Sequence, residues 1–334
     1  MNAVIPGLLD MESEFEKKTH LPAVQNDGFI WINLQKPSRH NIEMVAKEFG
    51  FHELNIEDSL SKNQLPKIER YEDHIFMVLH FATLDEETNL PNPSQVSFFV
   101  GSHYLVTIHQ GELKPLTELF EQCKKDVKQA GEIMGKSSGY LFHSIVDVMI
   151  DDLLHIMRKV VGNLDDLEDL VFDEMASAAK QISIVRREIT KLRRVTLPMK
   201  RTLHEFVTRD MPRFSEEDLT SYFGDVMDHL EKVIESLEAA KETVDIYKDT
   251  DFMLSTEKSN KILGVLTIIF TLTIPAAVLG TFFGMNMRVP GSVSEPWTFL
   301  GPYTTFIVII IGSIVPGICM HLYFRKQGWI GRSY

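Results

Sequence analysis

Apolar and polar positions divide the chain into two parts of different character. Residues 262–287 form a run of 26 residues without a charged side chain, and residues 296–320 form a second such run of 25. A bilayer core about 30 Å thick is crossed by roughly 20 apolar helical residues. We therefore predict a hairpin of two membrane-spanning helices at the C-terminal end. Its parts are a first helix over 262–287, a loop outside the membrane over 288–302, a second helix over 303–324 and a cytosolic tail over 325–334.

Before the hairpin, apolar residues first recur at the spacing of strands. Residues 29–34, 67–71, 74–82, 95–100 and 104–109 are rich in β-branched and aromatic side chains and are bounded by turn residues. Helical patterns lie between and after them, at residues 38–49, 52–64 and 113–130. Residues 1–27 are expected to be an amphipathic or loose lead-in. The pattern predicts a mixed α+β head domain over residues 1–135.

After residue 136 the apolar spacing is that of helices alone. Residues 141–175 and 176–200 predict an antiparallel helical pair within 136–214, with Pro198 near the end of the second helix. The first helix is acidic and the second is basic, so we expect the two to pair through their charges. A stalk helix then begins at the acidic cap of residues 215–218 and covers residues 215–261.

The stalk has no proline before the first apolar run, which predicts one continuous helix into the membrane. If the helix reaches Phe283, it has about 65 residues and is on the order of 100 Å long. A helix of that length without a partner is improbable, so we expect several copies of the chain to associate side by side.

Charge and cysteine content narrow the function. The formal net charge of −13 falls almost wholly before the hairpin and argues against a nucleic-acid partner. The two cysteines, Cys123 and Cys319, cannot form a disulfide framework, which fits a reducing cytosol.

The N-terminal residues do not have the pattern of a signal peptide. No glycine-rich nucleotide loop or hydrolase motif is present, so we expect no enzyme activity. The histidines are scattered, and His80, His109 and His229 are expected to be packing or surface residues.

Basic residues predict the orientation of the hairpin. Positive charge near membrane helices marks the cytosolic side. Basic residues lie before the first helix and after the second, whereas the loop between the helices carries one base and one acid. Both termini are therefore expected in the cytosol. The residues concerned are Lys258, Lys261, Arg325, Lys326 and Arg332 on the cytosolic side, and Arg288 and Glu295 in the loop.

One face of the first membrane helix mixes hydroxyl, amide and aliphatic side chains. In a symmetric bundle such a stripe would line a narrow pore with apolar constrictions. The same stripe also fits a helix-packing face, and the spacing alone leaves both interpretations open. Pro275 removes one main-chain hydrogen bond in the middle of the helix. The stripe contains Asn260, Leu263, Leu266 or Thr267, Thr271, Ile274, Ala277 or Val278, and Thr281.

Several segments resemble the CorA family of magnesium transporters. Gly284-Met285-Asn286, at the outer end of the first apolar run, is similar to the family's GMN motif. Residues 222–229, YFGDVMDH, resemble its stalk segment YFRDVYDH. Residues 259–269 and Pro275 resemble its entry into the membrane, and the order of head, helical pair, stalk and hairpin matches over nearly the whole chain. The resemblance implies a homopentameric funnel whose first membrane helix lines a central pore.

The resemblance also implies roles for individual residues. Asn286 would present a ring of neutral amide oxygens at the outer mouth, and such a ring can bind Mg²⁺ without removing its water, which that ion releases reluctantly. Gly284 and Met285 complete the motif. Further polar rings would come from Asn260, Thr271, Thr281 and Asp249, and the hydrophobic gate from Leu263, Leu266 and Ile274.

A regulatory site for cytosolic Mg²⁺ is implied as well. Asp225 matches the stalk carboxylate of a site between subunits of the family, and Asp85 is the expected partner from the head domain. Two carboxylates repel each other when the site is empty and are bridged by a divalent cation. Binding would therefore hold a closed pentamer together.

The sequence departs from the family pattern in the loop at the outer mouth, which bears on which ion is transported. The loop after Asn286 has one acid, Glu295, where many family members carry more. The expected function is Mg²⁺ influx across the cell (inner) membrane, with Co²⁺ or Ni²⁺ as further ions and no ATP requirement. A zinc transporter of the same superfamily is the nearest alternative. A membrane-anchored signalling or scaffold protein is the alternative from another class, but it would need a motif in the head that is not visible.

Overall fold

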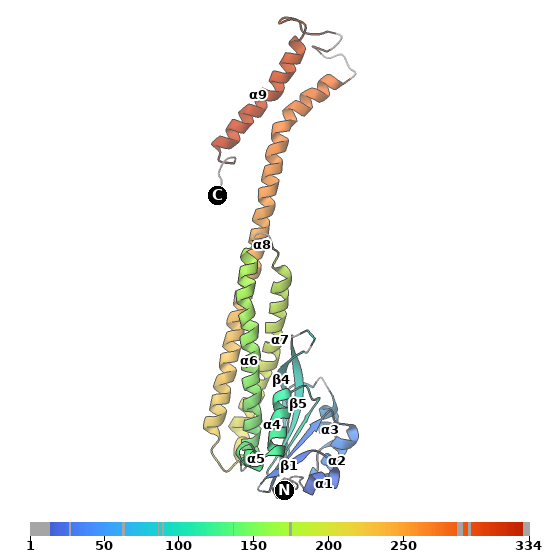
Figure 1. The fold of residues 1–334 in the computed structure, drawn as a ribbon, viewed down its shortest axis with the longest axis vertical. Coiled ribbons are helices and arrows are strands. Elements are labelled where there is room, and N and C mark those ends of the chain that lie inside the picture. The colour runs from blue at the N-terminus through green and yellow to red at the C-terminus, as the bar shows by residue number, and fades with distance from the viewer. Residues whose placement is uncertain are drawn as a thin grey trace, which may run out of the picture. The chain divides into compact units, whose positions relative to one another are not determined.

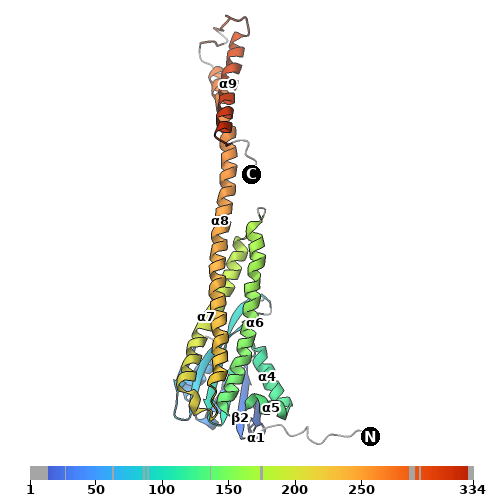
Figure 2. The same ribbon diagram turned by 90° about the vertical axis from the view of Figure 1, so that its left-hand side faces the viewer.

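A computed structural model of the protein describes residues 14–26, 28–61, 64–85, 87–88, 90–135, 137–173, 176–285, 290–292 and 295–329. The structure divides into two compact units, Met1–Asp251 and Phe252–Tyr334. The first contains a six-stranded sheet and its covering helices, and the second contains the C-terminal hairpin (Figures 1 and 2). The predicted order of an α+β head, a long helix and two C-terminal apolar helices is confirmed.

The sheet of the first unit has the strand order β1-β2-β6-β5-β4-β3. Neighbouring strands are antiparallel except β2 and β6, which are parallel. The strands are β1 (Ala23–Asn26), β2 (Phe29–Gln35), β3 (Lys67–Arg70), β4 (His74–Leu84), β5 (Pro91–Gly101) and β6 (Tyr104–His109). Sequence analysis missed β1, a strand of four residues, because it is too short to show an alternating pattern.

Helices cover both faces of this sheet (Figure 1). Strand β4 explains the two layers, since its side chains alternate between two hydrophobic cores: Ile75 and Met77 face one core, Phe76 and Val78 the other. The second core lies under α2 (Arg39–Phe49) and α3 (Glu53–Leu60). Short helix α1 (Glu14–Thr19) precedes the sheet.

The first core lies under a second set of helices. These are α4 (Lys114–Lys125), α5 (Val127–Met134), α6 (Ser138–Phe172), α7 (Ala179–Arg209) and the N-terminal part of α8 (Thr220–Gly284), with a short 3-10 helix η1 (Met211–Arg213) before α8. The single helix predicted over 113–130 is wrong. Asp126 adopts an extended conformation there, and its side chain accepts a hydrogen bond from the main-chain N–H of Lys128, which starts a new helix.

Helix α7 continues eleven residues beyond Pro198, contrary to the prediction that it ends nearby. A proline inside a helix removes a hydrogen bond and costs about 3 kcal/mol. The apolar face of α7 continues past it, because Met199, Leu203 and Phe206 are all fully buried. Burial of these side chains, each contributing about 1.5–3 kcal/mol, outweighs the cost.

Charged side chains of α7 pair with α8, so the expected pairing with α6 is wrong for these residues. Arg193 contacts Glu238 at 3.2 Å, Arg186 contacts Asp245 at 3.5 Å, and Lys200 contacts Glu231. The carboxylate of Glu168 on α6 accepts a hydrogen bond from the hydroxyl of Tyr247 on α8 instead. Helix α8 therefore supplies partners for both neighbouring helices.

Helix α8 has 65 residues, which confirms the predicted continuous helix. It begins at Thr220, whose main-chain N–H is capped by the Asp218 carboxylate at 2.9 Å. Its N-terminal part is anchored by side chains spaced three or four residues apart, including Phe223, Val226, Leu230 and Val233, all fully buried.

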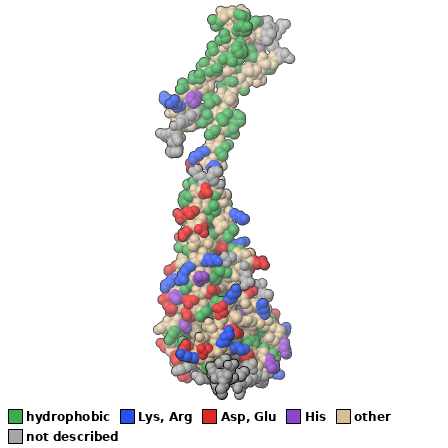
Figure 3. All heavy atoms as spheres, viewed as in Figure 1, with side chains coloured by type: hydrophobic (Ala, Val, Ile, Leu, Met, Phe, Trp, Pro, Cys, Tyr) green, Lys and Arg blue, Asp and Glu red, His purple; other side chains and the backbone are tan. Residues whose placement is uncertain are grey.

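In the second unit, the C-terminal part of α8 lies beside α9 (Thr304–Lys326) (Figure 1). Two glycines of α9 permit the close approach: a Cβ at Gly312 would lie 3.2 Å from Leu279, and one at Gly317 would lie 3.7 Å from the carbonyl of Leu272. Both helices are long and apolar enough to cross a membrane, since an 18-residue stretch of each has a mean hydropathy of 2.4 in α8 and 2.2 in α9. Hydrophobic side chains cover the surface of this part of the molecule (Figure 3).

Candidate functional site

The predicted pore residues lie on α8 at positions that share one helical face. Steps of 11, 3, 4, 4, 3 and 7 residues separate them, and each step returns to nearly the same side of an α-helix. Leu266 lies at the edge of this face. The members in order are Asp249, Asn260, Leu263, Thr267, Thr271, Ile274 and Thr281. Asp249 belongs to the first unit and the others to the second.

Threonine hydroxyls on this face are oriented by the helix itself. Thr267 donates its hydroxyl proton to the carbonyl of Leu263 at 2.7 Å, Thr271 donates to Thr267 at 2.7 Å, and Thr281 donates to Ala277 at 2.8 Å. A hydroxyl has one proton and two lone pairs. Because each proton is used within the helix, the oxygen lone pairs are left to face away from it. Such oxygens attract cations and the hydrogens of their bound water.

The proposed gate residues are exposed apolar side chains. Leu263 is 57% exposed, Leu266 45% and Ile274 54%. Asn260, between the charged part of α8 and these residues, is exposed as well. Figure 1 shows a bend in the C-terminal part of α8, and Pro275 is the proline inside this helix, which accounts for a bend there.

Only part of the tripeptide Gly284-Met285-Asn286 is described. Gly284 is the last residue of α8, and Met285 follows it with 45% of its surface exposed. Asn286 lies outside the described residues. The assignment of Asn286 to the outer mouth therefore stays a prediction.

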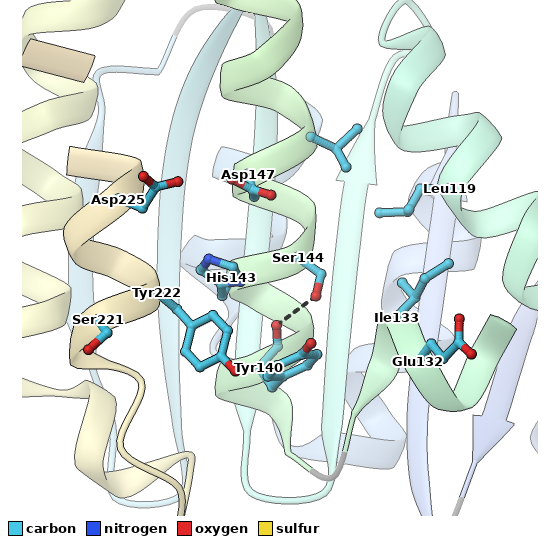
Figure 4. Close-up of a pocket in the computed structure, with 11 residues that line it drawn as sticks. Leu119, Glu132, Ile133, Tyr140, His143, Ser144, Asp147, Ser221, Tyr222 and Asp225 are labelled. Carbon is cyan, nitrogen blue, oxygen red and sulfur yellow. Dashed lines mark hydrogen bonds between the residues drawn. The ribbon is translucent and has the colours of Figure 1, made fainter. Parts of the chain in front are cut away.

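A second group of side chains forms a candidate metal centre in the first unit. The ligand atoms of Asp147, Asp225 and His229 all lie within 4.8 Å of one another. Asp147 is on α6, and the other two are one turn apart on α8, where His229 Nε2 lies 3.9 Å from an Asp225 oxygen. Asp147 and Asp225 also line a cavity of about 520 Å³ between α6, α8 and the α4–α5 region (Figure 4).

Burial and neighbouring charges act on the carboxyl group of Asp147 at this centre. Partial burial raises the pKa of Asp147, and the nearby negative charges of Asp151 and Asp225 raise it further, whereas His143 and His229 lower it. A carboxylate that loses water and faces a second carboxylate gains most from a divalent cation between them. Asp225 supplies the more exposed oxygens and Asp147 the more buried ones.

Sequence analysis named Asp225 as a candidate metal ligand, did not name Asp147, and expected His229 to be a packing or surface residue; the structure places the three side chains together. The spacing of Asp225 and His229, four residues apart on one helix, was a signal that both face the same way. His143 and Asp147 show the same spacing on α6, but only the packing of α6 against α8 brings Asp147 to the others.

Asp85 lies elsewhere in the first unit. It follows β4, and its Oδ1 accepts hydrogen bonds from the main-chain N–H and the hydroxyl of Thr88, at 2.8 and 2.7 Å. These hydrogen bonds lower its pKa. Asp85 lines a different cavity, of about 1050 Å³, from the one that Asp225 lines. The pairing of Asp85 with Asp225 across two subunits stays a prediction.

These features define a class of protein: an α+β domain followed by two helices apt to cross a membrane, of which the first is the C-terminal part of the long helix α8. The first unit carries a cluster of candidate metal ligands, and α8 carries a polar stripe. The family model of the CorA-like Mg²⁺ transporter protein matches residues 26–326. The chain belongs to this family.

Relatives of known description agree. The chain is 26% identical over 313 residues to the cobalt/magnesium transport protein CorA of Thermotoga maritima, covering 93% of this chain and 86% of that one. It is 24% identical over 303 residues to the putative metal ion transporter YfjQ of Bacillus subtilis, covering 90% of each. Its fold is similar to the complete structure of the CorA magnesium transporter from Methanocaldococcus jannaschii, with a TM-score of 0.73, 18% identity and coverage of 92% and 93%.

Proposed function

We propose that the protein is a channel for divalent cations, with Mg²⁺ as its main substrate and Co²⁺ or Ni²⁺ as further ions. The observation that carries the proposal is the face of α8 on which hydroxyl and amide side chains alternate with apolar ones along a membrane-apt helix. Membership of the CorA-like family and relatives named as magnesium and cobalt transporters support it.

A single copy of this helix cannot enclose a path, so the channel needs several copies around an axis. We propose a homopentamer in the cell (inner) membrane, with both termini in the cytosol and α8 facing the axis. Asn286 binds the hydrated ion at the outer mouth, Asn260 and Asp249 receive it on the inner side, and Leu263, Leu266 and Ile274 form the gate. A potential of 100 mV, negative inside, drives a doubly charged ion inward with about 4.6 kcal/mol, so no ATP is needed.

Regulation is proposed to act through cytosolic Mg²⁺ at Asp225, with Asp85 of a neighbouring copy as its partner. An occupied site neutralises carboxylates that otherwise repel, and so favours the closed assembly. Loss of the ion releases the constraint and lets the gate open.

Uptake of Mg²⁺ into liposomes containing the purified chain tests the pore. We expect Asn286→Ala to reduce the rate by roughly tenfold or more, because the ion loses a ring of oxygens at the entrance. Ser313→Ala on α9 is the matched control, since it removes a hydroxyl that is bonded within its own helix at 2.8 Å and is expected to leave the rate unchanged. Wild-type rates in Asn286→Ala would refute the pore assignment. Inhibition by internal Mg²⁺ that persists in Asp225→Ala would refute the regulatory one.

A further inference from the structure

Basic residues occur on α7 as three doublets that repeat every seven residues. The doublets are Arg186-Arg187, Arg193-Arg194 and Lys200-Arg201. The first member of each doublet forms a salt bridge with α8 of the same chain. The second member is exposed and has no salt bridge or side-chain hydrogen bond to a described residue. Residues seven apart lie on nearly the same face of a helix, so Arg187, Arg194 and Arg201 form one row, called the basic row below.

Helix α8 carries acidic residues in a matching arrangement. They form three pairs, with three residues between the positions of each pair and seven between successive pairs. The second members, which are Glu231, Glu238 and Asp245, are the residues that pair with α7 within the chain. The first members are exposed and form no salt bridge or side-chain hydrogen bond in the described part of the chain. These first members, Asp228, Glu235 and Glu242, are called the acidic row below.

The two unpaired rows match in position along the bundle as well as in sign and spacing. Helices α7 and α8 lie side by side and antiparallel (Figures 1 and 2), and their salt bridges show which residues lie at the same level. Relative to the contact of Arg193 with Glu238 at 3.2 Å, Arg194 and Glu235 are offset by two residues, about 3 Å along the helix. The same offset separates Arg187 from Glu242 and Arg201 from Asp228.

Within one chain the rows do not meet. Arg186 points toward α8, and one further residue turns the direction by about 100°, so Arg187 points to solvent. A second copy, rotated about an axis that runs along α8, keeps every residue at its level. Such a rotation brings the basic row of one copy to the level of the acidic row of the next, and a contact between two different surfaces can repeat around a closed ring.

The charge of the chain gives this match an energetic role. With a formal net charge of −13, copies of the chain repel one another. A row of arginines opposite a row of carboxylates offsets that repulsion where two copies meet. Asp249 follows Glu242 by seven residues but lies outside the acidic row. A seven-residue repeat turns by about 20° at each step, so Asp249 is turned about 60° from Asp228 and stays on the pore face.

We propose that the basic row on α7 of one copy binds the acidic row on α8 of its neighbour. The contact rests on the proposed homopentamer for its rotation axis, and it names the surface through which the first units associate. The guanidinium group of arginine can bind a carboxylate through two parallel hydrogen bonds. One exposed pair contributes little, but three pairs form a network that repeats at every boundary between copies. The pairs are Arg187 with Glu242, Arg194 with Glu235, and Arg201 with Asp228.

Cysteine cross-linking of the full-length protein in membranes tests the alignment of the rows. Arg194→Cys in one chain and Glu235→Cys in a second chain with a different tag are produced together, both with Cys319→Ser, while Cys123 stays buried. A short bifunctional thiol reagent should link them into a dimer that carries both tags. Each chain has one accessible cysteine, so this bond can only join two copies.

The matched control pairs Arg194→Cys with Asp228→Cys. Asp228 lies in the same row as Glu235 but about 10 Å further along the helix, so we expect at least about fivefold less of the doubly tagged dimer. Equal yields from the two pairs, or no dimer from the first pair, would overturn the proposal.

Reversal of charge tests the attraction between the rows. One chain carries glutamate at the three positions of the basic row, and another carries lysine at the three positions of the acidic row. We expect each reversed chain to form about tenfold less oligomer, because like charges then face each other. A chain with both reversals should regain most of it. The amount of oligomer is measured by size exclusion with light scattering at low salt.

The control for the reversed chains replaces three exposed lysines elsewhere on the first unit by glutamate and should leave the oligomer unchanged. These are Lys47, Lys125 and Lys128. Circular dichroism checks that every chain is folded, and if a reversed chain is not, the cysteine pairs decide.

The remaining outcomes separate this contact from its alternatives. Loss of oligomer in neither reversed chain, or in only one of them, would overturn the proposal, since the rows would not then be each other's partners. Slower Mg²⁺ uptake with an unchanged oligomer in the chain with the reversed acidic row would overturn it too, and would place that row along the ion path. Wild-type protein whose cysteine pair cross-links as expected but which moves no ion in liposomes would leave the contact standing and refute the channel.

Discussion

The two halves of helix α8 make the most informative comparison in the molecule. In the first unit its apolar side chains are buried: Leu230 and Leu237 have no exposed surface. In the second unit Leu263 and Ile274 are more than half exposed, although the helix is more apolar there. The two halves of α8 therefore need different surroundings. The apolar side chains of the first half are covered by the same chain, whereas those of the second half need lipid or other copies of the chain around them.

The comparison also separates the kinds of polar group that each half carries. In the first unit, charged residues on α8 pair with α7, as Glu238 does with Arg193. In the membrane-apt part, hydroxyls are bonded to the helix backbone, as in Thr271. Salt bridges fix a helix against particular neighbouring helices. Hydroxyls that donate to carbonyls of their own helix allow that helix to face apolar surroundings or a narrow aqueous path.

Labelling of the two cysteines tests whether protein covers the first unit's core and lipid covers the hairpin, because each thiol is either labelled or not. Cys123 is fully buried in the first unit, with a pKa raised to about 12 by burial, and Cys319 is exposed on α9. In liposomes we expect a charged maleimide to label neither, because protein shields one thiol and lipid the other. Ser177→Cys, at an exposed position of the first unit, is the positive control. Labelling of Cys319 in intact liposomes would show that α9 is not in the membrane.

Replacing one leucine in each half of α8 by alanine compares the two halves by their contribution to the free energy of unfolding. Leu230→Ala should lower the free energy of unfolding of the first unit by about 2–5 kcal/mol, because it leaves a cavity in a packed core. Leu263→Ala should change the same quantity by less than about 0.5 kcal/mol. Urea unfolding followed by Trp31 fluorescence measures both, in a chain whose Trp297 and Trp329 are replaced by Phe. Equal losses would mean that the exposed half of α8 supports the fold of the first unit.

Buried titratable groups of the first unit predict a dependence on pH. His109 is 2% exposed; its Nδ1 accepts the Gly111 N–H at 3.1 Å, and its Nε2 donates to Asn33 Oδ1 at 3.1 Å. Burial lowers its pKa to about 4. The unfolded chain binds this proton near pH 6.5 and the folded chain does not, so stability is complete above pH 6.5 and falls as the pH drops toward 4.

The total loss assigned to His109 is about 3 kcal/mol over that window. Urea unfolding at pH 7.5 and pH 4.5 measures it in the wild type and in His109→Gln, where the amide can still donate to Asn33. The variant should lose less stability between the two pH values. The same loss in both proteins would assign the pH dependence to other groups.

How far the sequence predicts the structure depends on whether the signal is local. The sixty-five residues of α8 were predictable, because helical spacing and the absence of proline in its first half are properties of neighbouring residues. The continuation of α7 past Pro198 was not, since core packing decides it. The same holds for the candidate metal centre. Asp225 was predicted by resemblance to be a metal ligand, but Asp147 comes close to it only through the packing of α6 against α8.

Replacing glycines on α8 by alanine is expected to give the smallest change in stability, and it tests whether another copy of the chain packs against the helix. A Cβ at Gly224, in the first unit, and at Gly264, in the second, meets no atom within 4 Å. Alanine is favoured over glycine inside a helix by about 1 kcal/mol, so Gly224→Ala should raise the free energy of unfolding by up to that amount. Gly264→Ala should do the same for α8 unless another copy of the chain packs closely there. Chemical cross-linking in membranes separates the two cases: a loss of oligomer in Gly264→Ala, with none in Gly224→Ala, would place a helix contact at Gly264. If Gly264→Ala leaves the amount of oligomer unchanged, lipid or an open path lies against Gly264, and Gly264 is not a contact between subunits.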